Sequence, residues 1–229
     1  MPGMIVLEDI ELVPVLLLEP FKFATENRSR PSGRCGDLPE DWHRYWSDCL
    51  GDSGLTGLNP LQRGSWHVPT TEFADPDILR RLLALIFNDW GGVDVLSDPE
   101  CTPVLNGGLA LYSPTHGLLA EPRCCADLSD TANWRAAATC TQPEWQMLWI
   151  GHPWLSVKCQ TPWLMIGDKL ETTPTEERWA ISPDELVRAV ATAESELGRF
   201  SGQIAMILTS LGYGGDTERM GRKLTGLEQ

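Results

Sequence analysis

The stretch from Ser182 to Leu211 places the strongest constraint on the fold. Ser182-Pro183-Asp184-Glu185 has the residue types of a capping box, with proline at the first helical position. Apolar residues then recur at steps of four and three: Leu186, Val190, Ala193, Leu197, Phe200, Ile204, Ile207 and Leu211. This spacing predicts one apolar face of a long amphipathic helix that ends at Gly212. Because such a face must be buried, we expect the helix to lie across a sheet.

Three shorter helices are expected before it. Asp75 to Asp89 has a capping aspartate, a proline at the first helical position and an apolar stripe, and Gly91-Gly92 ends it. Leu38 to Cys49 carries apolar residues at helical spacing, namely Trp42, Tyr45, Trp46 and Cys49. Asp130 to Ala138 forms a short helix that Ser129 or Asp130 caps.

The remaining apolar segments predict β-strands. Met4 to Phe23 is broken by two prolines, which favours one or two strands at a sheet edge. Further strands are expected at 109–112, 118–121, 145–150, 155–159 and 163–166. Their short connections imply antiparallel neighbours. The predicted fold class is therefore α+β: a mainly antiparallel sheet covered by the long C-terminal helix and a second helix.

The length of 229 residues suits one large domain. We expect residues 1–212 to form a single α+β domain. Within it, residues 50–72 are rich in Gly and Pro, and a long connection of this kind is either functional or mobile. An internal boundary, if there is one, is expected there. Residues 213–229 contain few apolar side chains and are predicted to be a loose tail.

The charge of the chain limits its partners. With 32 acidic and 18 basic residues, the formal net charge is -14. Nucleic acids and anionic membrane surfaces require clustered Lys and Arg, so we expect neither as a partner. An acidic surface attracts a basic protein from a distance, although the same charge also serves solubility alone.

Cysteine usage predicts a reducing, cytoplasmic environment. The seven cysteines are odd in number and form no C-x-x-C pair. The apolar run from Leu12 to Leu18 follows acidic residues, where a secretory signal would carry positive charge. It is also too short to span a bilayer. We therefore expect buried thiols rather than disulfides.

Reactive side chains gather between Gly108 and Asp168, which also holds five of the ten tryptophans. Cys124 or Cys125, His152 and Asp127 supply the nucleophile, base and orienting group of a Cys–His hydrolase. The spacing does not favour this reaction, because there is no nucleophile elbow. Neighbours on a strand also point to opposite faces, so one cysteine is expected in the core and the other under a loop.

Other site chemistries find less support. No pair of Cys or His residues has the spacing of a structural zinc site. Glu121 and Asp127, which flank the cysteine pair, could be the paired carboxylates of a glycosidase or nuclease. Carboxylates near loops are common in so acidic a chain, however, so their presence does not favour that function. No phosphate-binding loop or dinucleotide motif occurs. We therefore predict no catalytic residue, metal or cofactor.

His152 lies between Gly151 and Pro153, with Trp149 and Trp154 close in sequence. A histidine in a tight turn beside indole rings is expected to bond the backbone and hold the turn. The alternative is a polar contact within an aromatic binding face.

Several of these segments resemble the SUKH superfamily of bacterial immunity proteins. The residues that carry the resemblance are Leu105-Asn106-Gly107-Gly108 and Ala126-Asp127-Leu128-Ser129-Asp130 leading to Trp134. Paired strands and a closing amphipathic helix follow. The resemblance covers about residues 103–211 and implies an α+β module that neutralises a toxin, often a nuclease, by covering it.

The leading hypothesis is thus a non-enzymatic bacterial protein that binds another protein, such as a basic toxin. The expected partner-binding residues are Glu121, Asp127, Trp134, His152 and Trp154. Two alternatives stay open. One is the Cys/His-dependent hydrolase, and the other is an accessory subunit of a bacterial complex whose tryptophans bury against a fixed partner.

Overall fold

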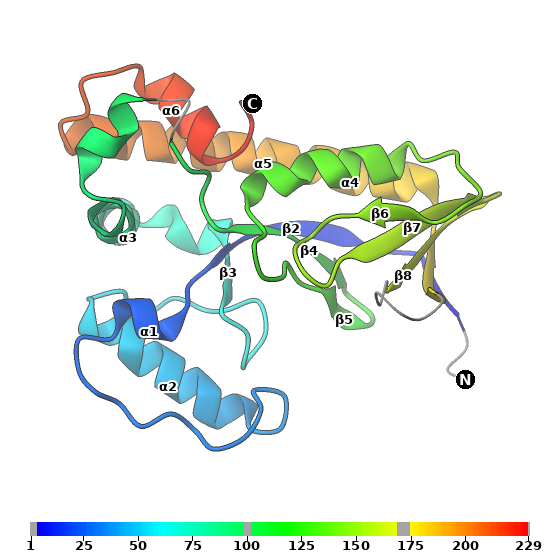
Figure 1. The fold of residues 1–229 in the computed structure, drawn as a ribbon, viewed down its shortest axis with the longest axis horizontal. Helices are drawn as coiled ribbons and strands as arrows, with labels where there is room; N and C mark the ends of the chain where they lie inside the picture. The colour runs from blue at the N-terminus through cyan, green and yellow to red at the C-terminus, as the bar shows by residue number, and fades with distance from the viewer. Residues whose placement is uncertain (1–3, 99–101, 169–174, 229) are drawn as a thin grey trace. The chain divides into compact units, whose positions relative to one another are not determined.

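The computed structural model describes residues 4–98, 102–168 and 175–228 (Figure 1). The chain divides into two compact units. The first comprises Met1–Pro14 and Asn106–Glu196, and the second comprises Val15–Leu105 and Leu197–Gln229. The boundary expected within residues 50–72 is not there, because that segment lies wholly in the second unit. The chain instead passes between units near residues 14, 105 and 196.

The first unit contains a five-stranded sheet in the order β1-β9-β8-β7-β6. Its strands are β1 (Ile5–Leu7), β6 (Gln146–Leu148), β7 (Leu155–Gln160), β8 (Trp163–Asp168) and β9 (Glu176–Ile181). The edge strand β1 pairs parallel with β9, and the other three pairs are antiparallel. The predicted α+β class with a mainly antiparallel sheet is therefore confirmed.

Strand β9 has no counterpart among the predicted elements. Its first three residues are charged and exposed, and only Trp179 to Ile181 are buried. Ion pairs connect the charged half to β7 and β8: Lys158 Nζ of β7 lies 2.7 Å from Glu177 Oε1, and Asp168 Oδ2 of β8 lies 2.9 Å from Arg178 Nη1. A half-charged strand lacks the apolar alternation that sequence analysis detects.

A hairpin lies between β1 and β6 in the order of the chain. It consists of β4 (Gly107–Ser113) and β5 (Gly117–Ala120), which pair antiparallel as expected. The 3-10 helix η3 (Leu128–Asp130) and helix α4 (Thr131–Ala138) follow. Asp130, one of the two predicted caps, occupies the N-cap position of α4 but makes no side-chain capping hydrogen bond to that helix. Asp127 caps η3 instead, because its side chain accepts from the Ser129 backbone N–H. The helical region therefore begins one 3-10 turn earlier than its periodicity indicates.

Helix α5 (Pro183–Ser210) is the long amphipathic helix. Seven of its predicted apolar positions are buried: Leu186, Val190, Ala193, Leu197, Phe200, Ile204 and Ile207. In the first unit, Arg135 of α4 donates to Glu194 of α5 through Nε at 2.9 Å, so the two helices lie side by side (Figure 1). Among residues 4–98, 102–168 and 175–228, no helix combines the length and apolar character needed to cross a bilayer.

The second unit is mostly helical. It contains α1 (Pro20–Phe23), α2 (Pro39–Asp52), the 3-10 helices η1 (Thr70–Ala74) and η2 (Val93–Ser97), and α3 (Pro76–Asp89). Strand β3 (His67–Pro69) pairs antiparallel with the second half of β2 (Glu11–Leu17). Asp75 caps α3 as predicted, since its side chain accepts from the Asp77 backbone N–H at 2.9 Å. The rings of Phe73 and Phe200 meet in the core, 6.1 Å apart between centroids.

The C-terminal segment corrects the prediction of a loose tail. It contains α6 (Thr217–Leu224), which Asp216 caps by accepting from the Arg219 backbone N–H at 3.0 Å. Met220 and Leu224 are buried. Gly221 allows a close approach to α5, because a Cβ there would lie 2.5 Å from the Ser201 carbonyl oxygen. Two buried side chains were too few for the periodicity to reveal this helix.

Replacement of Phe200 by alanine tests the packing of the second unit. Phe200 is 0% exposed, so Phe200→Ala should lower the free energy of unfolding by about 3–5 kcal/mol. The matched control is Met206→Ala on the same helix. Met206 is 67% exposed, and its removal should change stability by about 0.5 kcal/mol or less. Denaturant unfolding measures both, and equal effects would contradict this packing.

Candidate functional site

Three aromatic rings meet on the connection between β6 and β7. We call Trp149, His152 and Trp154 the three-ring cluster. The His152 ring centroid lies 4.5 Å from that of Trp149 and 5.2 Å from that of Trp154, edge-on in both cases. The two indoles are 6.1 Å apart between centroids and nearly parallel. His152 is exposed and both indoles are half-buried, so the cluster presents aromatic edges and one imidazole to solvent.

A second chain segment holds this connection in place. Cys124 and His152 form an antiparallel bridge. The Arg123 backbone N–H donates to the Ile150 carbonyl at 2.6 Å, and the His152 backbone N–H donates to the Cys124 carbonyl at 3.0 Å. His152 thus holds the turn with its backbone amide. Its imidazole contacts the rings of Trp149 and Trp154. The role of His152 in an aromatic binding face stays a prediction.

Gly151 permits this close approach. Its φ of 92° is unfavourable for residues with a side chain. A Cβ there would lie 2.5 Å from the Cys124 carbonyl oxygen, well inside van der Waals contact. Glycine at position 151 is therefore a structural requirement of the turn.

The predicted partner-binding residues separate into two environments. His152 and Trp154 touch each other in the three-ring cluster. Glu121 and Asp127 are half-buried, and they lie in the same chain segment as Cys124, whose carbonyl accepts from the His152 backbone N–H. Trp134 is different: it is 0% exposed on the inner side of α4. Its indole belongs to the core and offers no surface to a partner in this structure.

Asp127 and Asp130 form hydrogen bonds that cap a helical turn. Asp127 Oδ1 accepts from the Ser129 backbone N–H at 2.8 Å and from the Ser129 hydroxyl. Asp130 Oδ2 accepts from the Asp127 backbone N–H at 3.3 Å, which completes a capping box. Asp127, the carboxylate expected to orient His152 in a hydrolase, therefore caps η3 instead.

Burial changes the acidity of Asp130. This side chain is 8% exposed, and its Oδ1 accepts from Asn133 Nδ2 at 3.0 Å. Burial, together with the negative charge of Asp127, raises the pKa of Asp130 to about 7. Asp130 is thus placed to lose a proton near neutral pH.

The cysteine pair departs from its predicted arrangement. Cys124 and Cys125 are both exposed, and their Sγ atoms lie 3.3 Å apart. The expectation that they point to opposite faces is wrong, because this segment is a turn and not a regular strand: Cys125 has a φ of 68°. No group of three or more His, Cys, Asp or Glu side chains in the described ranges is placed to hold a metal ion.

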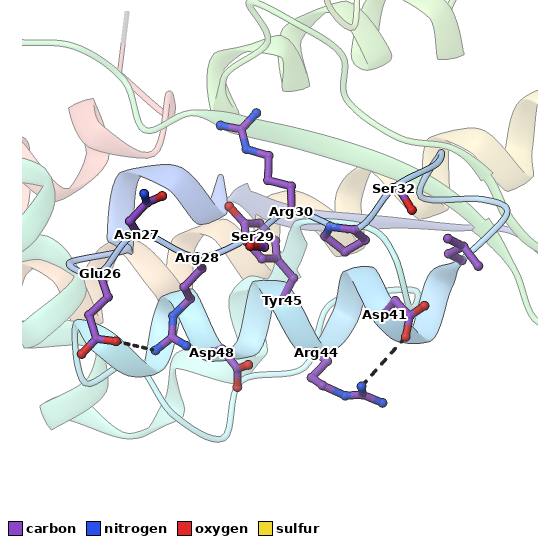
Figure 2. Close-up of a pocket in the computed structure, with 12 residues that line it drawn as sticks. Glu26, Asn27, Arg28, Ser29, Arg30, Ser32, Asp41, Arg44, Tyr45 and Asp48 are labelled. Carbon is purple, nitrogen blue, oxygen red and sulfur yellow. Dashed lines mark ion pairs between the residues drawn. The ribbon is translucent and has the colours of Figure 1, made fainter.

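The second unit contains a pocket that the sequence did not reveal. Figure 2 shows its lining, which comes from the loop 26–32 and from α2, with a cavity volume of about 550 Å³. Tyr45 projects from α2 toward the loop at Ser29 (Figure 2). Arg28 is anchored on Asp52, with Nε 3.1 Å from Oδ2, and this hydrogen bond lowers the pKa of the Asp52 carboxyl.

The charges of this loop pocket are balanced. Its lining has three arginines and three carboxylates, namely Arg28, Arg30, Arg44, Glu26, Asp41 and Asp48. Such a lining suits groups that carry both signs of charge better than a phosphate, which needs an excess of cations. The signal in the sequence was the concentration of arginines between residues 28 and 34 in an otherwise acidic chain.

Comparison of the chain with protein-family models, with curated proteins and with solved structures found no match. The resemblance to the SUKH superfamily therefore stays a prediction.

Substitution of Asp130 by asparagine tests the acidity of the capping box. Folded Asp130 keeps its proton up to a pKa of about 7, whereas an unfolded aspartate releases it at about pH 3.9. The folded state therefore binds more protons between these values. The free energy of unfolding should fall as the pH rises through this window, by at most about 1.4 kcal/mol per pH unit.

Asp130→Asn should remove that part of the pH dependence. The measurement is denaturant unfolding at a series of pH values from 4 to 8, on the wild type and on the variant. Two profiles that run parallel across the whole series would contradict the raised pKa of Asp130.

Replacement of Gly151 by alanine tests the close approach of the two segments. Gly117 is the matched control, because it lies in the same unit and also has a positive φ, 74°, but a Cβ there would meet nothing within 4 Å. Gly117→Ala should cost about 1–2 kcal/mol from backbone conformation alone. Gly151→Ala should exceed it by about 2 kcal/mol or more, because the added methyl meets backbone. Denaturant unfolding compares them, and equal losses would argue against the clash.

Proposed function

We propose that this protein is a non-enzymatic binding module of the immunity type, which neutralises a basic protein toxin by covering it. The observation that carries the proposal is the three-ring cluster. It places two indoles and an imidazole at the surface, on a connection tied by backbone hydrogen bonds to residues 123–124.

Aromatic clusters of this kind suit protein recognition. Tryptophan is enriched among the residues that dominate binding energy, because it offers a large apolar area together with a polar N–H. The rings of the cluster already contact one another, and Gly151 and the Cys124–His152 bridge fix the backbone beneath them. Little side-chain freedom is then lost when a partner binds.

Charge supports a basic partner. The chain carries a formal net charge of -14. Glu121 and Asp127 remain half-buried and add acidic groups to the segment that includes Cys124. Complementary charge accelerates encounter and selects partners of opposite sign. A nuclease fits this requirement, because the surface that binds a phosphate backbone is itself basic.

The hydrolase alternative draws on one observation, the bridge that brings Cys124 opposite His152. The carboxylate expected to complete it, Asp127, instead caps η3 through Ser129. The imidazole ring of His152 contacts the rings of Trp149 and Trp154. The arrangement therefore favours recognition over nucleophilic catalysis.

Alanine at Trp154 tests the proposed face. The full chain is immobilised, and the proteins that it captures from the native host lysate are identified. The captured partner is then purified and titrated against the wild type and each variant. Trp154→Ala should raise the Kd about 30-fold or more, as expected for a residue that contributes about 2 kcal/mol to binding. The wild-type association rate should fall as salt is raised from low to physiological levels.

The matched control is Phe21→Ala. Phe21 is an aromatic residue of the other unit and is 50% exposed, so its removal should leave the Kd within about twofold. The proposal fails if no basic protein binds, or if Trp154→Ala and Phe21→Ala bind the partner equally well while both remain folded.

A further inference from the structure

Two neighbouring thiols meet at the surface of the first unit. The Sγ atoms of Cys124 and Cys125 are 3.3 Å apart and both side chains are exposed. Adjacent residues of an extended strand would direct their side chains to opposite faces. Here the two sulfur atoms are in contact, which requires a different backbone conformation.

A tight turn supplies this conformation. The Ala126 backbone N–H donates to the Arg123 carbonyl at 3.1 Å, which makes the two cysteines the central residues of a four-residue turn. Cys125 has a φ of 68°, the only positive φ of a non-glycine residue among those that the structure describes. A cysteine is an unfavourable choice there, because its Cβ crowds the backbone and glycine or asparagine is ordinarily preferred.

Contacts outside the turn keep it in this state. Arg123 and Cys124 bond to the backbone of Ile150 and His152 on either side of Gly151. The turn is thus attached to the sheet through the β6–β7 connection. The pairing of the two sulfurs is a property of the folded chain and not of a free loop.

We propose that Cys124 and Cys125 are a redox-active pair of thiols, which a peroxide converts into a disulfide between neighbouring residues. This site lies beyond the proposed binding function and does not depend on it.

The chemistry balances with the peroxide as oxidant. One cysteine, as its thiolate, attacks a peroxide oxygen; the O–O bond breaks, a sulfenic acid forms and hydroxide leaves. The second thiol then attacks the sulfenic sulfur, an S–S bond forms, and the hydroxyl oxygen leaves as water. Two thiols and one hydrogen peroxide give one disulfide and two waters: the sulfurs lose two electrons and the peroxide oxygens gain them. A dithiol reductant reverses the reaction by exchange.

The other described cysteines lack these features. Cys49 is buried, and burial raises the pKa of its thiol, which disfavours the reactive thiolate. Cys35, Cys140 and Cys159 are only half-exposed. Of the cysteines within the described ranges, Cys124 and Cys125 alone are exposed. This pair therefore combines an exposed thiol with a second thiol close to it.

The sequence provides a direct assay. Trypsin cuts after Arg123 and Arg135, and the peptide between these sites contains Cys124, Cys125 and no other cysteine. The reduced full chain is treated with an equimolar amount of hydrogen peroxide, alkylated with iodoacetamide, digested and analysed by mass spectrometry. In the wild type, the peptide from peroxide-treated protein should carry no alkyl group and should have two hydrogens fewer than the dithiol form of the same peptide. Reduction with dithiothreitol before alkylation should restore both thiols and therefore both alkyl groups. The peptide with Cys159 should stay alkylated.

Single substitutions provide the controls. Cys124→Ser and Cys125→Ser should each abolish the internal disulfide, whereas Cys140→Ser should retain it. Circular dichroism checks that each variant is folded. Phenylarsine oxide, which bridges two nearby thiols, gives a second measurement on the reduced chain. Its adduct should form on the wild type and on Cys140→Ser, and be lost in the two other variants.

Several results would overturn the proposal. One is a wild-type peptide that stays doubly alkylated after peroxide treatment. Another is a peptide in which sulfinic acids or disulfides between chains form in place of the internal disulfide. An arsenical adduct on the wild type without conversion to the disulfide would likewise exclude the redox reaction, because it would show that two close thiols fail to react with peroxide.

Discussion

The candidate site depends on the close approach of two backbone segments, residues 123–124 and 150–152. Two hydrogen bonds join them, and Gly151 is the point of contact at which a Cβ would lie 2.5 Å from a carbonyl oxygen. This single approach positions the three-ring cluster on one side and the cysteine turn on the other. Aromatic recognition and thiol chemistry are therefore two consequences of the same backbone pairing.

Local signals made some of the fold predictable from the sequence. Helices α3 and α5 have a proline at the first helical position and apolar periodicity over several turns, and each signal acts within one segment. Strand β9 and helix α6 lacked such signals. Half of β9 is charged and is held by ion pairs to Lys158 and Asp168, and α6 is held by contacts that include Gly221 against Ser201. Elements that depend on distant partners do not show themselves in their own periodicity.

The candidate site was only partly predictable from the sequence, because the exposure of its residues also depends on distant parts of the chain. The sequence indicated which residues carry chemistry, because tryptophan, histidine and paired cysteines are conspicuous in any loop. It did not indicate their exposure. Trp134 and Trp154 occur in the same tryptophan-rich stretch, yet Trp134 is in the core, because it lies on a buried helix face, whereas Trp154 lies on a connection. The orientation of the cysteines was likewise set by a turn that one hydrogen bond closes, between Ala126 and Arg123.

The position of the cluster on a connection also bears on function. Residues of the inner strands β7, β8 and β9 lie between two neighbouring strands, whereas β1 and β6 are edges of this sheet. The β6–β7 connection lies outside the strands of the sheet, but two backbone hydrogen bonds, to Arg123 and Cys124, hold it in place. Loops that a rigid scaffold positions are where binding residues concentrate, because they combine exposure with a fixed geometry. Here the fixed geometry comes from the neighbouring backbone, and it lets aromatic rings remain partly exposed without collapsing into the core.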